Sequence, residues 1–158
     1  MEIVDLQSIP REIVVEFFVT HWGSPEMVIS TGVFDCSLLE GFAAVNEEGQ
    51  IQGMVTYHIE KHECEIISLD SIAEGKGIGT SLVKKVEEAA QEKKCTALKL
   101  ITTNDNLNAL KFYQKRGFFL SKLLPNAVSE ARKLKPQIPL VGNDGIPIRD
   151  EIELKKQL

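Results

Sequence analysis

The segment from Glu65 to Thr80, EIISLDSIAEGKGIGT, most constrains the fold of this chain, because it passes from a strand into a helix through closely spaced glycines. Its first half is rich in aliphatic and β-branched residues, which favour a largely buried strand. Gly75, Gly77 and Gly79 release the backbone from the limits that a Cβ imposes. A helix that begins at glycines presents free N–H groups and the positive end of its dipole. These features predict a site for an anion such as phosphate.

Two common phosphate-binding motifs do not match this segment. The dinucleotide-binding fingerprint needs glycines at its first, third and sixth positions, and Thr80 occupies the sixth. A P-loop needs a lysine followed by serine or threonine, whereas Lys76 is followed by Gly77. The segment therefore predicts an anion-binding turn of a different kind.

The composition is that of a soluble globular protein, and its 158 residues are expected to form one domain over 1–158. The net charge of −5 argues against a nucleic-acid partner. We find neither an apolar run of membrane-spanning length nor the layout of a signal peptide, so we expect a cytoplasmic protein that does not contact a membrane. Cys36, Cys64 and Cys95 are widely separated, which predicts buried, reduced thiols and no metal site.

The remaining pattern predicts a helix, then several strands, then alternating strands and helices. This order is typical of an α+β or mixed α/β fold, in which helices flank a central sheet. A helix between the strands at 63–71 and 97–103 makes these two strands parallel neighbours, whereas the tight connections at 47–50 and 61–62 indicate hairpins. We expect strands at 27–31, 41–46, 51–60, 63–71, 97–103, 118–124 and 148–158, helices at 10–22, 77–94, 107–116 and 127–134, and a loop at 32–40.

A second motif, NxxAxxFYxxxGF, runs from Asn106 to Phe118. The two motifs, in this order and about one helix and one strand apart, resemble the coenzyme A site of the GNAT N-acetyltransferases. The resemblance covers roughly residues 41–124. It implies the GNAT fold, in which a mostly antiparallel sheet contains a parallel pair of splayed strands. Residues 1–40 resemble the family's variable substrate-side helices only loosely, and 125–158 are expected to be an extension that closes the sheet.

The resemblance also implies where acetyl-CoA binds. In this family the glycine loop receives the pyrophosphate, and main-chain groups at the end of the preceding strand pair with the pantetheine arm. One residue departs from the pattern: Glu74 stands where the family usually carries Arg or Gln, and a carboxylate there would repel a pyrophosphate. The acetyl-CoA site is expected to comprise Leu69, Asp70, Ser71, Gly75, Lys76, Gly77, Ile78, Gly79, Thr80, Asn106 and Tyr113.

The implied reaction is direct transfer of an acetyl group from acetyl-CoA to a primary amine in a ternary complex, without a metal. Tyr113 resembles the family's general acid, which protonates the leaving thiolate. Glu65 matches a strand position where some histone-type members hold a catalytic glutamate. Because an ammonium group must lose a proton before it can attack, a base, a chain of water molecules or acidic surroundings are needed.

The identity of the base stays open at the level of the sequence. Regular alternation in the strand puts Glu65 on one face and Asp70 on the other, although a bulge would change this. His58 and His62 have suitable ordinary pKa values and are competitors. Trp22 and two phenylalanines, Phe34 and Phe42, are candidates to line the acceptor pocket, but aromatic residues are first of all core residues.

Each motif also has a plainer interpretation. Glycines before a helix often form only a turn, Asn106 is a suitable helix cap, Tyr113 a suitable packing residue and Glu65 an ordinary paired strand residue. Two other functions are therefore considered: a coenzyme A-binding regulatory module without transfer activity, and an unrelated nucleotide-binding protein. The sequence does not select the amine acceptor, and it allows a homodimer.

Overall fold

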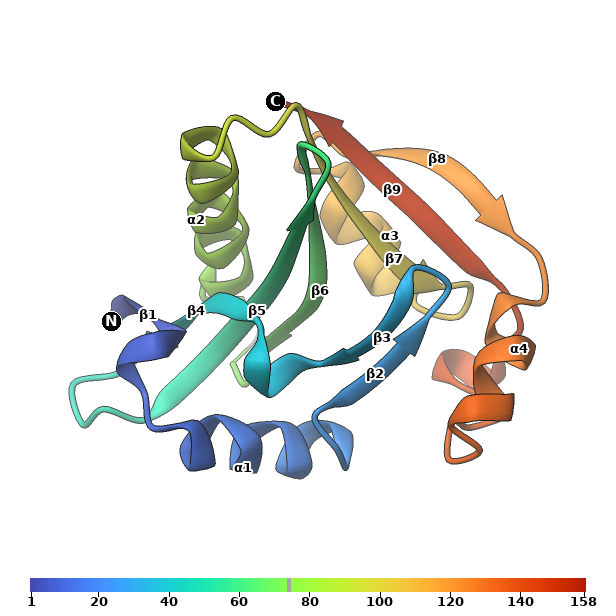
Figure 1. Ribbon diagram of the computed structural model, residues 1–158. Coiled ribbons are helices and arrows are strands. Elements are labelled where there is room, and N and C mark those ends of the chain that lie inside the picture. The colour runs from blue at the N-terminus through green and yellow to red at the C-terminus, as the bar shows by residue number, and fades with distance from the viewer. Residues whose placement is uncertain (74) are drawn as a thin grey trace. The chain divides into compact units, whose positions relative to one another are not determined.

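Figure 1 shows the computed structural model of the chain, which describes residues 1–73 and 75–158. Glu74, the residue that departs from the family pattern, lies outside the described residues. The chain divides into two units, each of which is described by itself. The first comprises Met1–Met27, Phe34–Leu98 and Leu158, and the second comprises Val28–Val33 and Lys99–Gln157.

The first unit is built on a sheet with the strand order β1, β4, β5, β6 and the start of β7. The pairs β1–β4, β4–β5 and β5–β6 are antiparallel. Helix α2 connects β6 to β7, which is the connection of a parallel pair. The expected mixed α/β fold, with a mostly antiparallel sheet and one parallel pair, is confirmed. The bounds are β1 Glu2–Asp5, β4 Glu40–Val45, β5 Ile51–Glu60, β6 Glu63–Ser71, α2 Ile78–Glu92 and β7 Ala97–Thr103.

Helices α1 (Arg11–Trp22) and α2 pack on opposite faces of this sheet. A Cβ at Gly53 of β5 would point at the α2 side chains Ile78 and Leu82. The next residue along β5 pairs with Asp70, whose side chain instead contacts Trp22 of α1. Successive residues of a strand point to opposite faces, so these contacts define an α1 face and an α2 face of the sheet.

The pairing of β5 with β6 contains one irregularity. Thr56 pairs with Ser68, but the next residue of β5 pairs with Ile66, so Ile67 is an extra residue on β6. Directly paired residues share a face. Glu65, Ser68 and Asp70 therefore all lie on the α1 face. Regular alternation would put Glu65 and Asp70 on opposite faces, but the bulge at Ile67 puts both on the same face.

The core of the first unit encloses the cysteines. Cys36, Cys64 and Cys95 are free thiols and all are buried, as expected from the sequence. Burial raises the pKa of Cys36 to about 11 and that of Cys64 to about 12. Both thiols therefore stay protonated at neutral pH, as expected of buried core residues.

In the second unit, the rest of β7 neighbours β9, and β9 pairs antiparallel with β8. The loop before β9 is anchored by Arg132 of α4, which donates hydrogen bonds to the carbonyls of Ile138, Pro139 and Ile148. The strand expected at residues 148–158 corresponds to β9. The bounds are α3 Leu107–Gln114, β8 Phe119–Leu124, α4 Ala127–Leu134 and β9 Glu151–Gln157, with a short 3-10 turn at Asn143–Gly145.

The expectation of a loop over residues 32–40 is wrong. This segment contains strand β3 (Gly32–Asp35), which forms a two-stranded sheet with β2 (Glu26–Ile29), followed by a 3-10 turn at Cys36–Leu38. Strands of four residues are too short to show a clear alternation in the sequence. A similar 3-10 turn, Leu6–Ser8, precedes α1.

The contact of α2 with β5 gives a test of this packing. A Cβ at Gly53 would lie 2.6 Å from Ile78 Cγ2 and 2.9 Å from the backbone oxygen of Asp70. We expect Gly53→Ala to lower the free energy of unfolding by about 1–3 kcal/mol, because helix and strand would have to move apart. Urea unfolding measures this change. Gln52→Ala, one residue earlier and on the other face, is the control, and an equal effect of both variants would contradict the close packing.

Candidate active site

The glycine loop enters α2 with the backbone conformation that its sequence predicts. Gly75 and Gly77 have φ values of 78° and 72°, in the left-handed region that favours glycine. Gly77 is the N-cap residue of α2, and its carbonyl accepts a hydrogen bond from Ser81 N at 3.0 Å. A Cβ at either glycine would meet no heavy atom within 4 Å, so the loop is open to a ligand. The first N–H groups of a 15-residue helix follow directly.

The strand that precedes this loop is paired on one side up to its end. On β5, the partners of Leu69, Asp70 and Ser71 are Val55, Met54 and Gly53, respectively. After the strand, the Ser71 hydroxyl donates to the Ala73 carbonyl at 3.0 Å, which begins the turn. The predicted pantetheine-binding residues and the predicted pyrophosphate loop are thus consecutive parts of the first unit.

Asp70 makes a contact that no local sequence pattern predicts. The indole Nε1 of Trp22, the last residue of α1, donates a hydrogen bond to Asp70 Oδ2 at 2.6 Å. Burial raises the pKa of Asp70 above its usual range, and the hydrogen bond from Trp22 limits this rise. His21 lies near enough to favour the ionised carboxylate as well. Trp22 and Asp70 are 48 positions apart, and no pattern in the sequence links them. Only its aromatic character made Trp22 a candidate to line the acceptor pocket.

The other candidate bases lie farther along the strand pair. Glu65 is 5% exposed and pairs in register with His58. The imidazole of His58 packs against Phe34, with ring centroids 5.6 Å apart. His62 lies in the turn before β6, where its carbonyl accepts a hydrogen bond from Thr96 N. Since β6 has nine residues, roughly 30 Å of strand separates His62 from the glycine loop.

A buried hydroxyl pair lies beside Asp70 on the α1 face. The hydroxyls of Thr56 and Ser68 are 2.6 Å apart, and both also lie within hydrogen-bonding reach of the Cys36 thiol. These groups satisfy one another in the core. The two hydroxyls are neutral and add no charge to the α1 face beside Asp70.

The second motif belongs to the second unit. Asn106 caps α3, since its Oδ1 accepts a hydrogen bond from Ala109 N at 3.1 Å. Tyr113 is 6% exposed and packs edge-to-face against Phe112 and Phe118, with ring centroids 5.0 and 5.3 Å away. Gly117, with a φ of 94°, follows the end of the helix. The capping and packing roles considered for these residues are therefore present in the structure.

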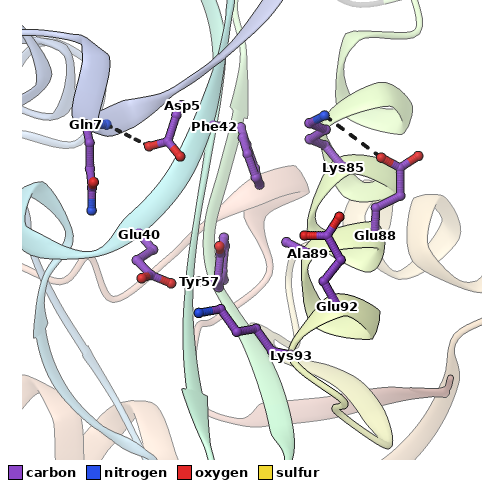
Figure 2. A pocket seen from close by; sticks show the side chains of 10 residues that line it. All are labelled: Asp5, Gln7, Glu40, Phe42, Tyr57, Lys85, Glu88, Ala89, Glu92 and Lys93. Atoms are coloured by element: carbon purple, nitrogen blue, oxygen red, sulfur yellow. Dashed lines mark hydrogen bonds and ion pairs between the residues drawn. The ribbon is translucent and has the colours of Figure 1, made fainter.

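A pocket of about 350 Å³ lies on the α2 face of the first unit (Figure 2). Phe42 and Tyr57 stack along it, with ring centroids 6.0 Å apart, and Lys85 of α2 lies over Phe42. Burial and the neighbouring carboxylate of Glu40 raise the pKa of Tyr57, so its hydroxyl stays protonated. Phe42 thus faces α2, whereas Trp22 contacts the opposite face, and the two do not line a common pocket as considered from the sequence.

Residues 1–73 and 75–158 were searched for a metal-binding cluster and for a membrane-spanning helix. Within these ranges, His, Cys, Asp and Glu side chains form no group of three or more that could hold a metal ion. No helix in the same ranges combines the length and apolar character that crossing a membrane requires.

Comparison with known proteins identifies the family. The acetyltransferase (GNAT) family model matches residues 10–118. The chain is 53% identical to the uncharacterized protein YxbD of Bacillus subtilis (strain 168), over 100% of this chain and 99% of YxbD. The chain therefore belongs to the GNAT acetyltransferase family.

Solved structures agree with this fold. A GNAT family acetyltransferase from Elizabethkingia anophelis with acetyl-CoA bound has a TM-score of 0.67, with 24% identity over 76% of each chain. The IAA acetyltransferase from Bacillus cereus ATCC 14579 has a TM-score of 0.69, with 21% identity over 99% of this chain and 100% of that chain.

The helix-capping role of Asn106 can be tested separately from any role in acetyl-CoA binding. We expect Asn106→Ala to lower the free energy of unfolding by about 1 kcal/mol, because the first turn of α3 loses its side-chain acceptor. Asn106→Asp keeps an acceptor oxygen and should retain nearly full stability. Thermal unfolding of both variants measures this difference, and equal losses in the two variants would show that the cap contributes little.

Proposed function

We propose that this chain is an N-acetyltransferase that moves the acetyl group of acetyl-CoA to a primary amine, by direct transfer in a ternary complex. The observation that carries this proposal is the glycine loop, which opens α2 through left-handed glycines directly after β6, in a chain of the GNAT family. The related structure from Elizabethkingia anophelis, described with acetyl-CoA bound, supports acetyl-CoA as the acetyl donor.

The loop is suited to a pyrophosphate on physical grounds. Backbone N–H groups at the start of α2 can donate to phosphate oxygens, and the helix dipole favours negative charge there. Lys76 and Thr80 are both exposed and add a cation and a hydroxyl beside these groups. We propose that main-chain groups of Leu69, Asp70 and Ser71 bind the pantetheine arm. Asn106 and Tyr113 are proposed as further acetyl-CoA-binding residues on the basis of the family motif to which they belong.

The chemistry requires three proton movements. A base takes one proton from the ammonium group, and the neutral nitrogen attacks the thioester carbonyl carbon to form the C–N bond. The nitrogen then loses a second proton as it becomes an amide nitrogen. When the C–S bond breaks, the leaving thiolate needs a proton. We propose that Tyr113 supplies this proton, and a backbone N–H near Leu69 or Asp70 stabilises the carbonyl oxygen. Glu65 and Asp70 are the candidate bases, since both lie on the α1 face of β6.

Acetyl-CoA is expected to stabilise the protein against heat. At a ligand concentration of a hundred times Kd, the gain is about 2.7 kcal/mol, which corresponds to a rise in Tm of about 5–10 °C. Gly77→Glu should abolish this rise, because a side chain and a negative charge would occupy the anion site. Differential scanning fluorimetry with and without acetyl-CoA measures both effects.

Gly145→Glu is a matched control for this experiment. Gly145 also has a positive φ, 73°, and open space where a Cβ would lie, but it belongs to the turn 143–145. The control should keep the acetyl-CoA shift. If neither acetyl-CoA nor free CoA raises the Tm of the unaltered protein, the proposed donor is wrong.

An amine panel tests the transfer itself. We expect release of free thiol with at least one of spermidine, glucosamine, lysine and a peptide with a free amino terminus. Tyr113→Phe should lower kcat by about a hundredfold, since the thiolate loses its proton donor. Tyr57→Phe removes the other tyrosine hydroxyl of the chain and should leave kcat unchanged. Acetyl-CoA binding without thiol release across the panel would favour a coenzyme A-binding regulatory module.

A further inference from the structure

Asp70 occupies the last part of β6, directly before the glycine loop. Its backbone pairs with Met54, and its side chain lies on the α1 face. The loop, by contrast, leads into α2 on the other face. Asp70 therefore extends a carboxylate to one side of the strand that precedes the loop, while the proposed pyrophosphate site continues toward the other side.

Trp22 fixes the position of this carboxylate. Helix α1 ends at Trp22 because Gly23 adopts a left-handed conformation and donates back to the Val19 carbonyl at 3.0 Å. The indole N–H then reaches Asp70 Oδ2 at 2.6 Å. Asp70 Oδ1 receives no hydrogen bond from residues 1–73 and 75–158. One carboxylate oxygen is thus held by the protein, and the other is available to a ligand.

The two residues can be reached from outside. Trp22 is 44% exposed and Asp70 is partly exposed, whereas Glu65 is 5% exposed in the middle of the sheet. Five residues, or roughly 15 Å of strand, separate Glu65 from Asp70. An amine that approaches the strand end would meet the Asp70 carboxylate first.

The surroundings of Asp70 suit a proton acceptor. Burial raises the pKa of Asp70, which makes its carboxylate a better base than an exposed aspartate. The titratable neighbours are His21 from α1 and Cys36 from the turn before β4. Cys36 stays neutral because its pKa is about 11. His21 lowers the pKa of Asp70 when it is protonated, so it limits the rise and does not reverse it.

We propose that the Asp70 carboxylate is the base that accepts the proton of the incoming ammonium group, and that Trp22 is the positioning residue that orients it. This inference rests on the proposed function and names the base within it. One proton moves from the ammonium nitrogen to Asp70 Oδ1, and the neutral nitrogen forms the C–N bond with the acetyl carbon. As the C–S bond breaks, the leaving thiolate takes the proton of Tyr113. The second proton that the nitrogen loses then restores the Tyr113 hydroxyl through solvent. Asp70 then releases its proton to solvent.

The pH dependence of kcat/KM tests this assignment with the best amine of the panel. Asp70→Asn keeps the shape and an acceptor for the indole, but it cannot take a proton. We expect it to lower kcat about a hundredfold at neutral pH and to leave the acetyl-CoA shift in Tm unchanged. Asp70→Glu should restore part of the activity. Glu16→Gln, which removes an exposed carboxylate from α1, is the charge control and should retain full activity.

Trp22→Phe distinguishes positioning from a merely structural role. The indole N–H stabilises the ionised carboxylate, so its removal should raise the pKa of Asp70 further. Since the base must be ionised to act, the acidic limb of the kcat/KM profile should move to higher pH in this variant. The carboxyl pKa, followed by ¹³C NMR of labelled aspartate, should move in the same direction. An unchanged profile and an unchanged carboxyl pKa would overturn the role of Trp22.

Activity measurements on two carboxylate variants separate the assignment of Asp70 from the proposed acetyl transfer. If Asp70→Asn retains the activity of the unaltered protein, or if Glu65→Gln instead removes the acidic limb, Asp70 is not the base, and the proposed acetyl transfer stands. If the unaltered protein releases no thiol with any amine of the panel, the proposed function fails, and the assignment of Asp70 fails with it.

Discussion

The pairing of β5 with β6 is the interaction on which the rest of the first unit depends. Both strands are largely buried, and each contributes side chains to the faces covered by α1 and α2. The extra residue Ile67 interrupts their alternation once. Because a slip of one residue exchanges the two faces of a strand, this bulge decides that Ser68 and Asp70 face α1 together with Glu65. The acidic groups of the strand are thereby gathered on the face opposite α2.

The α2 face is used for a different purpose. Gly53 lets Ile78 and Leu82 approach the strand closely, and Ile78 is also the first residue of the helix that the glycine loop opens. The close contact fixes where the helix begins relative to the end of β6. An anion-binding loop built from backbone groups needs such support, because its N–H groups act only if they are held in place before the ligand arrives. The contact of Gly53 with Ile78 and Leu82 thus holds the start of α2 against β5.

Local sequence patterns predicted much of this arrangement. Contacts between segments far apart in the chain could not be predicted. Gly75 and Gly77 indicated a strained entry to a helix, and both have positive φ. Apolar periodicity indicated α1, α2 and the long strands within a few residues of their observed ends. The bulge at Ile67 could not be placed, because it is defined by the register with another strand. The bond between Trp22 and Asp70 joins two segments whose local patterns say nothing about each other, and the β2–β3 hairpin is too short to show a period.

Trp22 is the sole tryptophan of the chain, and its indole N–H bonds the Asp70 carboxylate. Indole fluorescence responds to the charge and polarity near its ring nitrogen, and the ring of Trp22 is partly open to solvent. The protein thus carries its own optical reporter near the end of β6. Its emission is expected to change when the Asp70 carboxyl group takes up a proton, and no second tryptophan of the chain adds to the signal.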